Sequence, residues 1–228
     1  DSNIAIGHGA GDALTTGTNN VAVGHLALST EDANGFNVAV GYQSLKTLNA
    51  GANAYNVAVG YNSGTSISTG VENTIIGGLA GDSLTLGNEN VAVGLASIGA
   101  DTKGKKSVAV GWGTLTNQNF TSATDTHNTA VGYNAGNDIT TGDSNTLIGS
   151  QAGDALTTGK NNTVVGKGAL GTDTKGKECV AIGNGALFSQ NFTSLTNVFN
   201  VAVGSSAGEQ ITTGDKNTLI GGLAGDRL

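Results

Sequence analysis

Short apolar runs of three residues recur along the chain, each ending at a glycine, as in Asn56-Val-Ala-Val-Gly60. The third residue of a run is always Val or Ile, the first is Val, Thr or Ile, and the middle one is mostly Ala. Neighbouring side chains of a β-strand point to opposite faces, so the first and third residues share a face. We therefore predict a short strand in each run, with the Val/Ile face buried and the alanine face open to another chain.

The glycines that end these runs mark a repeat. Subtracting neighbouring residue numbers gives 17 at nine intervals, 19 at one and 21 at two. We call these residues the motif glycines and call the segment from one to the next a rung. They are Gly7, Gly24, Gly41, Gly60, Gly77, Gly94, Gly111, Gly132, Gly149, Gly166, Gly183, Gly204 and Gly221.

A longer period lies above the rung. The stretch 101–105 reads Asp-Thr-Lys-Gly-Lys and recurs at 173–177, and motif glycines four rungs apart are separated by 72 residues from Gly94 onward. Residues 1–228 are thus predicted to form one repeat array with four-rung super-repeats at about 18–87, 88–159 and 160–228. We expect this array to be part of a longer fibre.

Each rung also carries one predicted interior aliphatic residue. Four positions after the motif glycine stands either Leu or Ile, or else Gly, and wherever Gly stands there an aliphatic residue follows three positions later. The intervening residues are rich in Thr, Gly, Asn and Asp, which favour tight turns. The two sets are Leu28, Leu45, Ile98, Leu115, Leu170 and Leu187, and Leu14, Ile67, Leu84, Ile139, Leu156, Ile211 and Leu228.

An asparagine precedes nearly every strand. Stacked rungs would place these side chains above one another, where their amides can bond to neighbouring rungs in a structural ladder. Ser107 and Cys179 are the exceptions. The ladder residues are Asn3, Asn20, Asn37, Asn56, Asn73, Asn90, Asn128, Asn145, Asn162, Asn200 and Asn217.

Composition narrows the classes of function. The net charge of −7 argues against binding nucleic acid, which needs a basic face. No apolar run is long enough to span a membrane. The single cysteine, Cys179, excludes an intrachain disulfide, and we interpret it as a small buried side chain rather than one of three thiols meeting in a trimer.

Candidate catalytic chemistry is sparse. His8, His25 and His127 lie on different rungs with no spacing typical of a triad, so we expect no catalytic residues and no enzyme. Gly-Asp pairs such as Gly81-Asp82 and Gly153-Asp154 resemble calcium-binding β-roll repeats, but their spacing is wrong for that site. We expect no metal and no cofactor.

Partner contact is predicted at aromatic residues. Four of them directly follow motif glycines, where an outward position suits recognition, although packing along neighbouring rungs explains them too. Two more stand in the insertions at 117–122 and 190–196, either as contact residues or as clips between chains. The six candidates are Tyr42, Tyr61, Trp112, Tyr133, Phe120 and Phe192.

The runs Asn56-Val-Ala-Val-Gly60 and Asn128-Thr-Ala-Val-Gly132 resemble head repeats of trimeric autotransporter adhesins, whose usual period is fourteen. The 17-residue unit is similar to repeats of phage tail-fibre and surface-fibre proteins. The resemblance implies an all-β fold, a left-handed parallel β-solenoid or β-roll of about thirteen rungs, assembled as a homotrimer.

From this we expect an extracellular structural segment of a phage tail fibre or similar surface appendage. It would give reach and multivalent attachment to a host surface, through a glycan or protein receptor. The alternative is a bacterial trimeric surface adhesin that binds host matrix or cells. A polysaccharide-degrading spike would need a pair of carboxylates beside a groove.

Overall fold

The computed structural model describes residues 2–227, which divide into two compact units. Of the described residues, 2–110 and 119–125 form unit 1, and 111–118 and 126–227 form unit 2. Both units are parallel β-solenoids, and no helix occurs within residues 2–227. The predicted all-β solenoid fold is therefore confirmed, and the same residues contain no helix that could cross a membrane.

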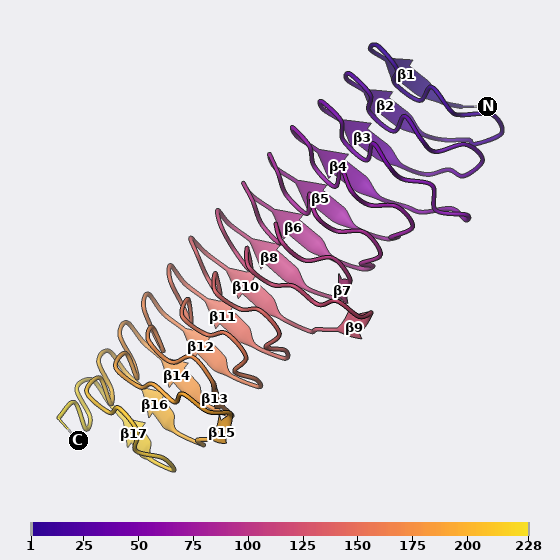
Figure 1. Cartoon of the computed structure of the whole chain (residues 1–228). Coiled ribbons are helices and arrows are strands. Elements are labelled where there is room, and N and C mark those ends of the chain that lie inside the picture. The colour runs from indigo at the N-terminus through magenta and orange to yellow at the C-terminus, as the bar shows by residue number, and fades with distance from the viewer. Residues whose placement is uncertain (1, 228) are drawn as a thin grey trace. The chain divides into compact units, whose positions relative to one another are not determined.

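Seven strands of unit 1 stand in chain order in one parallel sheet, each made of the three residues before a motif glycine. Paired residues occupy equivalent positions, so Ala22 lies opposite Ala39 and Val23 opposite Val40. Figure 1 shows these strands following one another along the unit. They are β1 (Ile4–Ile6), β2 (Val21–Val23), β3 (Val38–Val40), β4 (Val57–Val59), β5 (Thr74–Ile76), β6 (Val91–Val93) and β8 (Val108–Val110).

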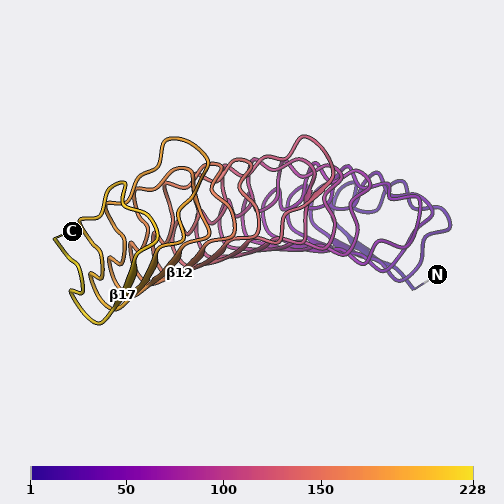
Figure 2. The same ribbon diagram turned by 90° about the horizontal axis from the view of Figure 1, so that it is seen from below.

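Unit 2 repeats this arrangement with six strands in the same parallel register. Figure 2 shows that β12 and β17 lie along one side of the unit, while the connecting loops close the rungs. The strands are β10 (Thr129–Val131), β11 (Thr146–Ile148), β12 (Thr163–Val165), β14 (Val180–Ile182), β16 (Val201–Val203) and β17 (Thr218–Ile220). Seven and six strands together match the thirteen predicted rungs.

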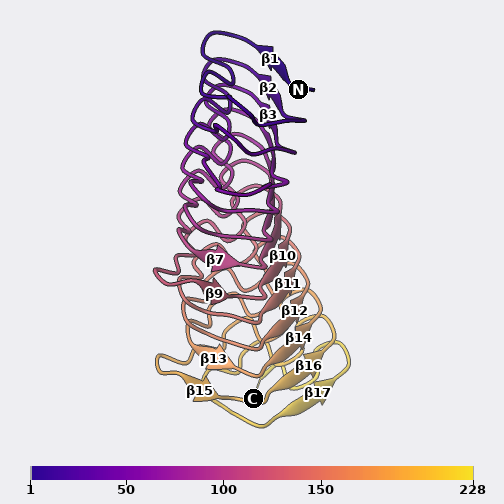
Figure 3. The same ribbon diagram turned by 90° about the vertical axis from the view of Figure 1, so that its right-hand side faces the viewer.

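Each unit also has a pair of two-residue strands outside the long sheet. In unit 1, β7 (Gly104–Lys105) pairs with β9 (Thr124–Asp125). In unit 2, β13 (Gly176–Lys177) pairs with β15 (Thr196–Asn197). Figure 3 shows β13 and β15 on the other side of the rung from β14 and β16. The insertions therefore attach to the preceding rung instead of hanging free.

The predicted orientation of the strands is wrong. The middle residues, such as Ala22, Ala58 and Ala130, are completely buried inside the solenoid, whereas the flanking Val and Ile side chains face outward. Ile76 is 38% exposed and Ile148 is 40% exposed. The interior holds the middle residue whether it is small or large, because Ile75 and Leu147, which stand at the same position in other rungs, also have no exposed surface. The alanines are thus no surface for another chain.

The interior aliphatic position is confirmed. Leu28, Leu45 and Ile98 point inward from the first position, and Ile67 and Leu84 point inward from the second, all with no exposed surface. Leu14 is half-buried, and Leu228 lies outside the described residues. Each interior site is filled from one of two backbone positions.

Backbone geometry explains the invariant glycines. At Gly77, for example, φ is +134°, a value open in practice to glycine alone. A Cβ there would lie 2.5 Å from the carbonyl oxygen of Gly94 on the next rung. Both the conformation and the close approach of successive rungs therefore exclude any side chain.

Candidate functional site

A ladder of stacked aromatic rings runs along unit 1 at the position after the motif glycine. The ring centroids of His8, His25, Tyr42 and Tyr61 lie 5.2–5.4 Å apart in succession, with interplanar angles of 9–12°. Tyr42 and Tyr61 remain 43% and 57% exposed. Because neighbouring rings cover one another's faces, the ladder presents ring edges, hydroxyl groups and imidazole nitrogens to solvent.

Unit 2 carries a shorter stack at the same repeat position. The rings of Trp112 and Tyr133 are 5.1 Å apart and nearly parallel, and each side chain is about half exposed. The structure thus brings the four predicted aromatic residues into two stacks, in which packing along the rungs and outward exposure coexist.

A further stack was not predicted from the sequence. Phe36 and Tyr55 stand directly before ladder asparagines, and their exposed rings lie 5.0 Å apart. Their φ values are +64° and +52°, so both adopt a left-handed conformation that directs the chain into the next strand. The signal that could have found them is their shared position in consecutive rungs.

Phe120 and Phe192 lie differently from the ladder aromatics. Phe120 is only 6% exposed, and Phe192 is half-buried. Their backbone N–H groups donate to the Oδ1 atoms of the buried Asp101 and Asp173, each over 3.1 Å. The prediction of Phe120 as a contact residue is wrong, because its side chain is almost completely buried. The two aspartates hold the insertions in place.

The ladder asparagines form two interactions with the following rung. The Oδ1 atom of Asn73 accepts a hydrogen bond from the N–H of Asn90 over 3.0 Å, and its Nδ2 donates to the carbonyl of Gly87 over 2.9 Å. The same pair of bonds recurs at Asn20, Asn56 and Asn145 among others, with most of these side chains completely buried. This geometry is that of a structural ladder, since each amide joins two rungs.

Glutamines from the insertions enter this ladder where an asparagine is missing. Gln190 is buried, and its Nε2 donates to Asp173 Oδ2 over 2.5 Å and lies 3.3 Å from the sulfur of Cys179. Its Oε1 accepts a 2.7 Å bond from Asn200. Gln118 makes the equivalent 2.9 Å bond with Asn128. Each glutamine stands in the rung after one in which Ser107 or Cys179 replaces the asparagine, and this recurrence is the signal in the sequence that could have found the contact.

Cys179 lies completely buried within its rung. Removal from water raises the pKa of its thiol to about 11. A protonated thiol with no exposed surface is a poor nucleophile and metal ligand. The interpretation of Cys179 as a small buried side chain agrees with this position.

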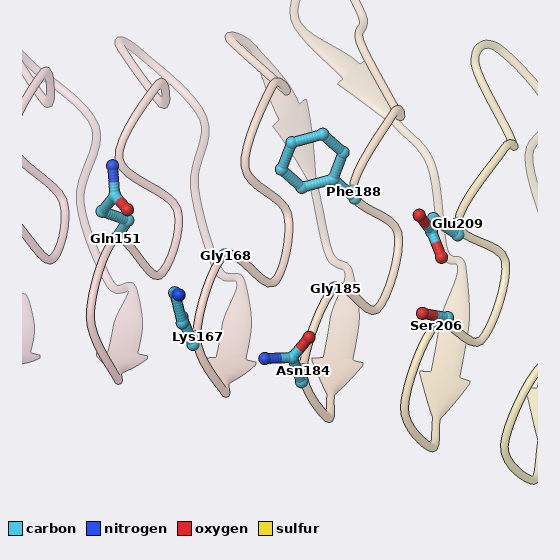
Figure 4. Close-up of a pocket in the computed structure, with 8 residues that line it drawn as sticks. All are labelled: Gln151, Lys167, Gly168, Asn184, Gly185, Phe188, Ser206 and Glu209. Carbon is cyan, nitrogen blue, oxygen red and sulfur yellow. The ribbon is translucent and has the colours of Figure 1, made fainter.

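An open groove of about 290 Å³ crosses four rungs of unit 2. In Figure 4 the side chains of Lys167, Asn184 and Ser206 follow one another on successive rungs, with Phe188 and Glu209 in a second row beside them. Gln151, Gly168 and Gly185 complete the lining. None of these residues is predicted as a contact site from the sequence, because their side chains differ from rung to rung.

Other candidate chemistry remains dispersed. Within residues 2–227 no group of three or more His, Cys, Asp or Glu side chains is placed to hold a metal ion. Burial raises the pKa of Asp82 and of Asp154, the aspartates of two Gly-Asp pairs. His8 and His25 belong to the aromatic ladder, whereas His127 precedes a ladder asparagine.

Comparison with known proteins adds no functional assignment. No protein-family model, curated protein or solved structure matches the chain significantly.

Proposed function

We propose that this chain is a structural segment of an extracellular fibre, in a phage tail fibre or a similar surface appendage. The observation that carries the proposal is the ladder of buried asparagines, which joins successive rungs by recurring bonds in both units. A solenoid in which rungs contact their neighbours is lengthened by adding rungs, without any change of fold. Such a segment gives reach, and several copies on one fibre give multivalent attachment to a host surface.

We further propose that three copies assemble through the outward Val and Ile side chains of the strands, named here the aliphatic stripe. The stripe contributes two apolar or Thr side chains per rung, Ile76 and Ile148 among them, and carries no charge. Contiguous exposed apolar surface of this kind marks interaction sites in soluble proteins. This interface replaces the alanine row, whose side chains lie inside the solenoid.

Light scattering tests the assembly. We expect a mass near three times 22.4 kDa for the purified segment. The double variant Val59→Lys/Ile76→Lys should reduce the mass to one copy and leave the β-type circular dichroism unchanged, because both side chains point away from the interior. Thr69→Lys, an exposed position outside the stripe, is the matched control and should remain trimeric. A wild-type monomer would overturn the homotrimer.

The alternative function is a bacterial trimeric surface adhesin that itself binds host matrix or cells. Both proposals use the same repeat, so the domains attached to it discriminate them. A virion-attachment domain or a trimerisation chaperone in the full-length protein supports the tail fibre, and a membrane anchor supports the adhesin.

The proposal assigns no catalysis to the segment. Glycoside hydrolysis uses two carboxyl groups flanking the scissile bond. Among the eight residues that line the groove, Glu209 is the carboxylate and Lys167 the other charged group. A binding role fits this set better than hydrolysis. Incubation of the segment with polysaccharides, followed by an assay for new reducing ends, should show no product.

A further inference from the structure

The groove in unit 2 exists because two consecutive rungs have glycine at the second position after the motif glycine. A Cβ at Gly168 would lie 3.8 Å from the ring of Phe188, and one at Gly185 would lie 3.7 Å from the Oγ of Ser206. These are ordinary contacts, so packing does not require glycine at either place. Because Gly168 and Gly185 have no side chains, the surface is open at these two rungs.

Backbone conformation does not require glycine there either. The φ values of Gly168 and Gly185 are +61° and +65°. The same position carries Asn134, Gln151 and Ser206 on other rungs of the unit, at φ values of +53° to +57°. Asn in particular tolerates this conformation. The fold therefore does not require glycine at 168 and 185, and the missing side chains serve to form the groove.

The floor and sides of the groove combine one apolar surface with hydrogen-bonding groups of both kinds. Phe188 is 44% exposed and offers an aromatic surface. Lys167 donates hydrogen bonds, Glu209 accepts them, and Asn184 and Ser206 do both. The ion pairs among the described residues involve Lys106, Lys160 and Lys216, so Lys167 and Glu209 are not neutralised by each other.

We propose that this groove binds a short uncharged oligosaccharide that lies across the rungs. The C–H face of a sugar ring packs on an aromatic ring, while its hydroxyl groups both donate and accept hydrogen bonds. An apolar ligand would desolvate the polar lining without compensation, and a strongly charged one would meet either Lys167 or Glu209 as a like charge. The lining spans three strand spacings, about 14 Å at about 4.8 Å each, which suits a linear ligand.

This inference rests on the proposed attachment function and names the ligand class for it. It is also independent of the aliphatic stripe, because none of the lining residues belongs to a strand of the long sheet. The groove and the assembly can therefore be tested separately.

The test is binding of the purified segment to an array of defined oligosaccharides that includes maltohexaose, cellohexaose and chitohexaose. We expect binding to at least one uncharged glycan. The variant Gly185→Asn, which fills the groove with a residue found at this position elsewhere, should weaken that binding by at least about tenfold without lowering the melting temperature. Ala96→Asn places the same residue at the same repeat position in unit 1 and should bind like the wild type.

Absence of binding to every uncharged glycan overturns the inference, as does preferential binding to acidic glycans or equal binding by Gly185→Asn. A wild-type protein that is trimeric but binds none of the uncharged glycans would overturn the groove alone. A monomeric protein that binds glycan would overturn the assembly alone.

Discussion

Gln190 accepts a 2.7 Å hydrogen bond from Asn200 through its Oε1 atom, although it reaches this site from an insertion ten residues earlier in the chain. It thereby supplies the amide that is missing from the ladder in the rung of Cys179. Each of the last two super-repeats replaces one ladder asparagine, at Ser107 or Cys179, and each also adds one loop that carries a glutamine, Gln118 or Gln190. The insertion and the substitution are therefore parts of one structural change.

This relationship predicts compensation between two substitutions. Cys179→Asn alone should destabilise the protein by about 1 to 3 kcal/mol, because Gln190 already occupies the space. Gln190→Ala alone should cost a similar amount by leaving Asp173 and Asn200 with fewer partners. The double variant should recover at least about 1 kcal/mol in a double-mutant cycle measured by urea denaturation. Strict additivity would contradict the shared site.

The asparagine ladder predicts that removal of a single side-chain amide destabilises the protein strongly. Asn73→Ala leaves the N–H of Asn90 and the carbonyl of Gly87 unsatisfied in a buried place. We expect the free energy of unfolding to fall by about 3 kcal/mol. Asn49→Ala, at an exposed asparagine, is the control and should change it by less than about 0.5 kcal/mol. Equal effects in denaturant titrations would argue against the ladder.

The motif glycines predict a sharp difference between two Gly→Ala substitutions. Gly77→Ala combines a forbidden φ with a clash against Gly94 and should cost more than about 3 kcal/mol. Gly51 also has a positive φ, +71°, but no atom lies within 4 Å of its Cβ position. Gly51→Ala should therefore cost only about 1 to 2 kcal/mol. Thermal melting of both variants measures the contribution of the clash.

The buried thiol predicts a pH dependence. Because burial raises the pKa of Cys179 from 9.0 to about 11, the folded protein holds this proton where the unfolded chain releases it. Below pH 9 the thiol is protonated in both states, so the free energy of unfolding does not depend on it. As the pH rises from 9 to 11 the unfolded chain loses this proton first, and the free energy of unfolding should fall. Cys179→Ser, which copies Ser107, should reduce this fall in denaturation measured across that range. An unchanged slope would exclude the thiol as its source.

Much of the fold followed from local spacing. The regular motif glycines predicted every strand of the long sheet, and the shift of Leu or Ile between two positions predicted the interior residues Leu45 and Ile67. The motif glycine and the interior Leu or Ile recur on each rung, so one chain shows the same pattern many times. The positions of the asparagines were equally regular, because each amide must meet the next rung.

The tertiary structure decided which face of a strand is inside. Alternation separates Ala58 from Val57 and Val59 but does not say which side encloses the core, and the closure of each rung places the middle residue inside. The groove beside Phe188 and the contact of Gln190 with Asn200 likewise depend on residues from several rungs. Sequence alone determined the repeat and its strands, because these are local properties of the backbone. The tertiary structure decided which strand face is buried and where the groove lies, because both arise only when rungs with different side chains are stacked.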